Sequence, residues 1–91
     1  MNIAIVGATG NVGRKILEVL EKKELSIDNL YLLASSRSAG SKINFLGNEH
    51  EVLNLETFDF SKAKITFFAA GGKISEKFAE KAAEHSLVID N

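Results

Sequence analysis

Three glycines near the start of the chain have a spacing that suits phosphate binding. Gly7, Gly10 and Gly13 follow a short apolar run at residues 2–6 and precede a segment with helical spacing. Glycines between a strand and a helix permit a tight turn and let a pyrophosphate approach the backbone N–H groups of the helix. The candidate phosphate-binding residues are therefore Gly7, Thr9, Gly10, Asn11, Val12 and Gly13. Because the spacing is Gly-x-x-Gly-x-x-Gly rather than Gly-x-Gly-x-x-Gly, a bare turn without a ligand is the alternative.

A polar cluster follows the next apolar run, at residues 30–34. In a dinucleotide-binding fold the end of the second strand selects the cofactor, because an acidic side chain there accepts hydrogen bonds from the ribose 2′-hydroxyl of NAD. That position carries no acidic residue. It carries Ser35, Ser36, Arg37 and Ser38 instead. A guanidinium can pair with a phosphate through two hydrogen bonds, and serine hydroxyls can donate to its other oxygens. The cluster predicts NADP as the cofactor, with a solvated serine-rich loop as the alternative.

A further glycine segment follows the apolar run at residues 65–69. Ala70 and Gly71 stand at the carboxyl end of this expected strand, where ligands bind in open α/β sheets. We therefore expect both residues to face the cofactor. The alternative is a flexible turn that joins a strand to a helix.

The same reasoning finds no catalytic group. The chain has no cysteine, which excludes disulfides, thiolate metal sites and a cysteine nucleophile within these residues. His50 and His85 are its only histidines, and neither stands in a metal-ligand pattern or a Ser-His-Asp arrangement. We assign no catalytic residue and no metal site to this chain.

Strands and helices must position these residues, and the apolar pattern predicts their order. Apolar runs alternate with amphipathic segments, as in a sheet of parallel strands with helices packed against it. The expected elements are strands at 2–6, 30–34, 65–69 and 87–89, a helix to about residue 24, a hairpin of 43–46 and 50–53 around Gly47-Asn48, a helical turn within 56–63, and a helix from Ser75, its N-cap, to about residue 85. The predicted fold is α/β, a Rossmann-like, mostly parallel sheet with flanking helices and a small hairpin insertion.

Length and charge bound the class of protein. With 91 residues, the chain is one domain, residues 1–91, or a piece of a larger one. Its net charge of -1 gives no general attraction for nucleic acid or anionic lipid. No basic leader or membrane-spanning run is present, so we expect a cytoplasmic protein. Because the chain ends directly after the last expected strand, we interpret it as the N-terminal part of a longer protein.

Four segments together resemble a known family. Residues 7–13 (Gly-Ala-Thr-Gly-Asn-Val-Gly), 35–40 (Ser-Ser-Arg-Ser-Ala-Gly), 67–72 (Phe-Phe-Ala-Ala-Gly-Gly) and 88–91 (Val-Ile-Asp-Asn) are similar, in order and spacing, to the NADP-binding N-terminal domain of aspartate-semialdehyde dehydrogenases. The resemblance covers essentially the whole chain. It implies that Thr9 to Gly13 hold the pyrophosphate, Arg37 and Ser38 the 2′-phosphate, and Ala70 and Gly71 the nicotinamide side.

The resemblance also implies an activity for the full-length protein. That family reductively dephosphorylates L-aspartyl 4-phosphate to L-aspartate 4-semialdehyde with NADPH, a step of lysine, methionine and threonine biosynthesis and of the route to diaminopimelate. Its cysteine, histidine and substrate-binding arginines lie in a later domain that also forms a homodimer, so this chain alone is expected to bind NADP(H) and to be inactive. The alternatives are an acetylglutamyl-phosphate reductase, a nucleoside-sugar epimerase with the same glycine spacing, and a dinucleotide-sensing module without catalysis.

Overall fold

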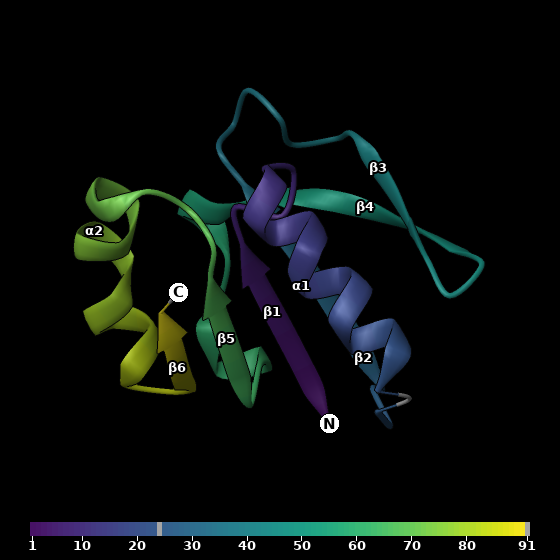
Figure 1. Cartoon of the computed structure of the whole chain (residues 1–91). Helices are drawn as coiled ribbons and strands as arrows, with labels where there is room; N and C mark the ends of the chain where they lie inside the picture. The colour runs from purple at the N-terminus through teal and green to yellow at the C-terminus, as the bar shows by residue number, and fades with distance from the viewer. Residues whose placement is uncertain (24, 91) are drawn as a thin grey trace.

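The computed structural model, which describes residues 1–23 and 25–90, is a six-stranded sheet with a helix on each face (Figure 1). The strands lie in the order β3-β4-β2-β1-β5-β6, and every neighbouring pair is parallel except β3 and β4. The elements are β1 Asn2–Val6, α1 Asn11–Lys22, β2 Asn29–Ala34, β3 Lys42–Phe45, β4 Asn48–Asn54, the 3₁₀ turns η1 Leu55–Thr57 and η2 Phe60–Lys62, β5 Ile65–Phe68, α2 Gly72–Ala83 and β6 Leu87–Asp90. The mostly parallel α/β fold is therefore confirmed. The expected end of the first helix at Glu24 and the terminal Asn91 lie outside the described residues.

Strand β1 is the centre of the sheet. It pairs with β2 on one side and with β5 on the other. Its residues from Ile3 to Val6 are at most 1% exposed, as expected for a strand covered on both faces. Because β1, β2 and β5 run in the same direction, the segments that follow them meet at one edge of the sheet. These segments are the glycine loop, the serine-rich loop and the turn at Ala70.

The two helices cover opposite faces of the sheet. The chain moves from β1 through α1 to β2 in one direction along the sheet, and from β5 through α2 to β6 in the other. Right-handed crossovers in opposite directions place their helices on opposite faces. Leu17 and Leu20 of α1 pack with Ile3 and Ile5, whereas Phe78 of α2 packs in the cluster that faces the other way.

The hairpin differs from the prediction in its turn and in its role. Its two-residue loop is Leu46-Gly47, with φ of 50° and 80°, and not Gly47-Asn48. Asn48 instead belongs to β4 and pairs with Phe45, as the residue pair next to the turn. Positive φ at both loop residues matches the twist of hairpin strands, and here a leucine occupies the first position. β4 then pairs in parallel with β2, so the hairpin forms one edge of the main sheet (Figure 1).

The segment after β4 forms two short helical turns where the sequence predicted one. The side chain of Asn54 accepts a hydrogen bond from the N–H of Glu56, and that of Asp59 accepts one from the N–H of Ser61. These bonds start η1 and η2 separately. Hydrogen bonds from the hydroxyl and the backbone of Ser61 also hold the pKa of the Asp59 carboxyl below its ordinary value.

Helix α2 begins three residues before the predicted cap. Gly71 is its N-cap, and Ser75 lies within the helix and is buried. The Ser75 hydroxyl donates to the Oδ2 atom of Asp90, at 2.6 Å, and so ties α2 to the end of β6. The extra turn is stabilised because Ile74 packs against the core below α2. The prediction that Ser75 is the N-cap of this helix was therefore wrong.

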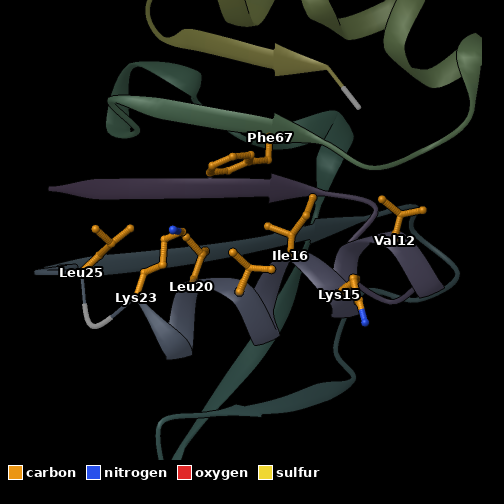
Figure 2. Close-up of a pocket in the computed structure, with 8 residues that line it drawn as sticks. Val12, Lys15, Ile16, Leu20, Lys23, Leu25 and Phe67 are labelled. Atoms are coloured by element: carbon orange, nitrogen blue, oxygen red, sulfur yellow. The ribbon is translucent and has the colours of Figure 1, made fainter.

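One apolar strip of the sheet has no helix over it. Figure 2 shows Val12, Ile16 and Leu20 of α1 directed toward the strands, with Phe67 of β5 across β1, around a hollow of about 440 Å³. In the parallel register Phe67 stands beside Ile89, so Leu87 and Ile89 of β6 share this face. They are 63% and 41% exposed. Helix α1 covers the β1 and β2 side of this face, and among the described residues no element covers the part over β5 and β6.

Candidate functional site

A crevice of about 300 Å³ lies at the carboxyl ends of the central strands. Its lining residues are Val6, Gly7, Thr9, Ala34, Ser35, Ser38, Leu55, Ala70 and Ile74. Five of the residues predicted from the sequence are among them, namely Gly7, Thr9, Ser35, Ser38 and Ala70. The crevice therefore brings together residues from all three predicted segments, and none of its lining side chains is charged.

The first glycine of the loop joins the ends of β1, β2 and β5. Gly7 has a φ of +84°, which favours glycine, and its N–H donates to the carbonyl of Leu33 at 2.8 Å. A Cβ atom at Gly7 would stand 2.9 Å from the backbone nitrogen of Ala70. Both the turn and the close approach of Ala70 therefore require glycine here.

The other two glycines of the loop have different surroundings. A Cβ atom at Gly13 would stand 2.4 Å from the carbonyl oxygen of Gly7, so Gly13 lets α1 pack on the loop. A Cβ atom at Gly10 would meet only that same oxygen, at 3.5 Å, which is an ordinary contact. Gly10 also has a φ of -82° and a ψ of 173°, a conformation that any residue adopts. Close backbone packing within the chain requires a glycine at position 13, but it does not require one at position 10.

Helix α1 begins at this loop without a side-chain cap. Gly10 is the N-cap, and its carbonyl accepts the first helical hydrogen bond, from the N–H of Arg14 at 3.0 Å. The N–H groups of Asn11, Val12 and Gly13 belong to the first turn, where a helix has no internal acceptors. These groups and the helix dipole favour an anion. The side chain of Val12 lines the hollow beside Phe67 instead, so only its backbone is available to a ligand in the crevice.

The serine-rich segment after β2 folds into a turn. The N–H groups of Ser38 and Ala39 both donate to the carbonyl of Ser35, at 3.0 Å each. Ser35 and Ser38 line the crevice, whereas Ser36 and Arg37 are exposed and do not line it. In residues 1–23 and 25–90, no ion pair includes Arg37. Its guanidinium therefore has no carboxylate partner within the part of the chain that the structure describes.

The turn after β5 contributes one side chain and a helix end. Ala70 lines the crevice, while Gly71 is exposed at the N-terminus of α2 and does not line it. Four aliphatic lining residues were not predicted as site residues: Val6 and Ala34, which end β1 and β2, and Leu55 and Ile74. Leu55 directly follows β4, and its role could have been found only by placing β4 beside β2. Ile74 reaches the crevice because α2 starts earlier than predicted.

The described residues supply neither a metal centre nor a membrane span. Within 1–23 and 25–90, no group of three or more His, Cys, Asp or Glu side chains could hold a metal ion. None of the helices in that part of the chain is long and apolar enough to cross a bilayer. His50 lies edge-on to the ring of Phe45, with 6.2 Å between the ring centroids, which is a packing contact.

These features define a class of protein. A parallel sheet whose central strand ends in a glycine loop, at an uncapped helix and beside a crevice, is the architecture of Rossmann-type dinucleotide-binding domains. The model of the semialdehyde dehydrogenase family, NAD binding domain, matches residues 2–91. The chain belongs to the semialdehyde dehydrogenase family.

Several curated relatives and solved structures are named aspartate-semialdehyde dehydrogenases, and one relative, 44% identical over 91 residues, is named USG-1 protein homolog of Azotobacter vinelandii. The chain is 47% identical over 91 residues to the aspartate-semialdehyde dehydrogenase of Shewanella violacea, covering 99% of this chain and 27% of that protein. It is 50% identical over 92 residues to the enzyme of Legionella pneumophila, covering 100% of this chain and 26% of that protein. The crystal structure of aspartate semialdehyde dehydrogenase II from Vibrio cholerae superposes with a TM-score of 0.93 at 50% identity, covering 99% of this chain and 27% of that one. The chain thus spans about a quarter of the length of these relatives.

Proposed function

We propose that this chain binds NADP(H) in the crevice at the ends of β1, β2 and β5, as the cofactor-binding part of an aspartate-semialdehyde dehydrogenase. The observation that carries the proposal is the open surface at Gly10. The fold does not need a glycine there, yet a ligand lying across the uncapped N-terminus of α1 would need the space. The match to an NAD binding domain supports a dinucleotide ligand in general, without a choice between NAD and NADP.

In this proposal each segment contacts one part of the cofactor. The pyrophosphate lies over the glycine loop, from Thr9 to Gly13, and is held by backbone N–H groups of α1. The adenosine side follows β2, where Ser35 and Ser38 line the crevice and Ser36 and Arg37 stand at its rim. The nicotinamide side borders Ala70 and Gly71 after β5.

The choice of NADP rests on the charge at the end of β2. No carboxylate follows β2 to accept hydrogen bonds from a ribose 2′-hydroxyl, and the first charged side chain after the strand is Arg37. Because no carboxylate of residues 1–23 and 25–90 pairs with Arg37, its guanidinium can meet a 2′-phosphate through two charge-assisted hydrogen bonds. We therefore propose NADP rather than NAD.

The proposed activity belongs to the full-length protein. The relatives are named aspartate-semialdehyde dehydrogenases, and this chain matches about a quarter of their length. When bound, NADPH supplies the hydride for the reduction of L-aspartyl 4-phosphate. The residues of this chain bind and orient the cofactor, while the catalytic groups, the small-molecule substrate site and the homodimer contact are proposed to lie outside residues 1–91. The isolated chain is then inactive.

Titration of the native chain with both cofactors tests the proposal. The fluorescence of NADPH should increase when it binds to the chain. We expect NADPH to bind more tightly than NADH at the same salt concentration, because only NADPH carries the 2′-phosphate that Arg37 can contact. Absence of binding by either cofactor would contradict the function as a whole. Tighter binding of NADH would contradict only the choice of NADP.

A further inference from the structure

A second arginine stands at the glycine loop. The Nε atom of Arg14 donates a hydrogen bond of 3.3 Å to the carbonyl oxygen of Thr9, and Thr9 lines the crevice. Arg14 is exposed, and no ion pair within residues 1–23 and 25–90 includes it. A guanidinium has five N–H donors and no acceptor. Four donors of Arg14 are thus left after the bond to Thr9, and its charge has no carboxylate partner among the described residues.

The position of Arg14 on the helix directs it toward the β2 side of the crevice. Val12, Ile16 and Val19 line the hollow beside β5. At 3.6 residues per turn, Arg14 stands on the opposite side of α1, which is the side nearer β2. Helical side chains also lean toward the helix N-terminus, and the bond to Thr9 agrees with that direction. The loop that follows β2 contains Arg37.

We propose that Arg14 is a second specificity-determining residue, which shares the 2′-phosphate of NADP with Arg37. This inference rests on the proposed function. Two guanidiniums from different elements, α1 and the loop after β2, then flank the adenosine side of the crevice. The arrangement suits a dianionic group, because one arginine alone leaves part of the phosphate charge unpaired. The hydrogen bond to Thr9 restrains the Arg14 side chain before the cofactor binds.

Three single variants separate charge from positioning. Arg14→Gln removes the charge but keeps an amide that can donate to the Thr9 carbonyl, whereas Arg14→Lys keeps the charge. Lys15→Gln is the matched control, because Lys15 is the next residue, lines the hollow beside Phe67 rather than the crevice, and pairs with Glu18 at 3.6 Å. We expect Arg14→Gln to weaken NADPH binding by about three- to tenfold and NADH binding by less than about twofold. Arg14→Lys should recover part of the loss, and Lys15→Gln should bind as the native chain does.

The outcomes distinguish this inference from the function on which it rests. Circular dichroism first shows that each variant is folded. Equal losses of NADPH and NADH affinity would place Arg14 on the pyrophosphate and overturn its role in specificity. Native NADPH affinity in Arg14→Gln would also overturn that role. In the double variant with Arg37→Ala, the loss should be smaller than the product of the two single losses, because both side chains contact one phosphate. If the native chain binds no NADPH at all, the proposed function itself fails.

Discussion

Replacing Gly10 by valine should abolish NADPH binding while the chain stays folded. The backbone at Gly10, with φ of -82° and ψ of 173°, is one that valine adopts readily, and a Cβ atom there meets only the Gly7 carbonyl at 3.5 Å. The expected cost to stability is about 1 kcal/mol, because valine is a poorer N-cap than glycine. A bound pyrophosphate, however, would have to occupy the space that the branched side chain takes.

Gly13→Val is the matched control for this prediction. Its Cβ atom would lie 2.4 Å from the Gly7 oxygen and 2.7 Å from the Ala8 Cα atom, both of which are backbone atoms that cannot rotate away. We expect a loss of about 3 kcal/mol in the free energy of unfolding, from overpacking. Urea unfolding followed by circular dichroism measures both variants, and fluorescence titration measures their NADPH binding. Native affinity in a folded Gly10→Val variant would show that the loop is only a structural turn.

Arg37→Ala should weaken NADPH binding by roughly 30- to 150-fold and leave NADH binding almost unchanged. Losing a charge-assisted, two-bond contact costs about 2 to 3 kcal/mol, which corresponds to that range of affinities. Arg37 is exposed and has no ion-pair partner within residues 1–23 and 25–90, so the substitution breaks no ion pair among these residues. The change in affinity then reports the cofactor contact alone.

Arg37→Lys refines this experiment. Lysine keeps the positive charge but loses the planar pair of donors, so its NADPH affinity should fall between those of the native chain and Arg37→Ala. Titrations at two salt concentrations should also show a weaker salt dependence for Arg37→Ala with NADPH, because one ionic contact is missing. Equal losses for both cofactors would move Arg37 away from the 2′-phosphate.

The central strands and the loops that follow them could be predicted because their signals are local. The apolar run at residues 2–6 matches β1, and the glycines after it bound the turn to α1. Local patterns therefore located Gly7, Thr9, Ser35, Ser38 and Ala70, which the structure brings together at one crevice. The strand order could not be predicted in the same way, because right-handed crossovers fix the face on which a helix lies once the side of the next strand is known, and they do not determine that side.

The remaining features depend on contacts that are distant in the sequence. Leu55 lines the crevice only because β4 pairs with β2, across about twenty residues of chain, and that pairing leaves no local mark. Ser75 looked like a helix cap, yet it donates to Asp90, so tertiary packing determined where α2 begins. Leu46 occupies a left-handed turn position that the sequence assigned to other residues, because leucine is rare there.

The central position of β1 has a consequence for hydrogen exchange. Its backbone is hydrogen-bonded to strands on both sides and its residues from Ile3 to Val6 are buried, whereas β6 is an edge strand among residues 1–23 and 25–90. Amides in such a strand exchange with solvent only when the whole domain unfolds, while edge strands open locally. The slowest-exchanging strand therefore ends directly at the glycine loop. Addition of NADPH should slow the exchange of β1 amides by the factor through which binding raises the free energy of unfolding, whereas slower exchange at Asn11 and Val12 reports occupancy of the loop itself.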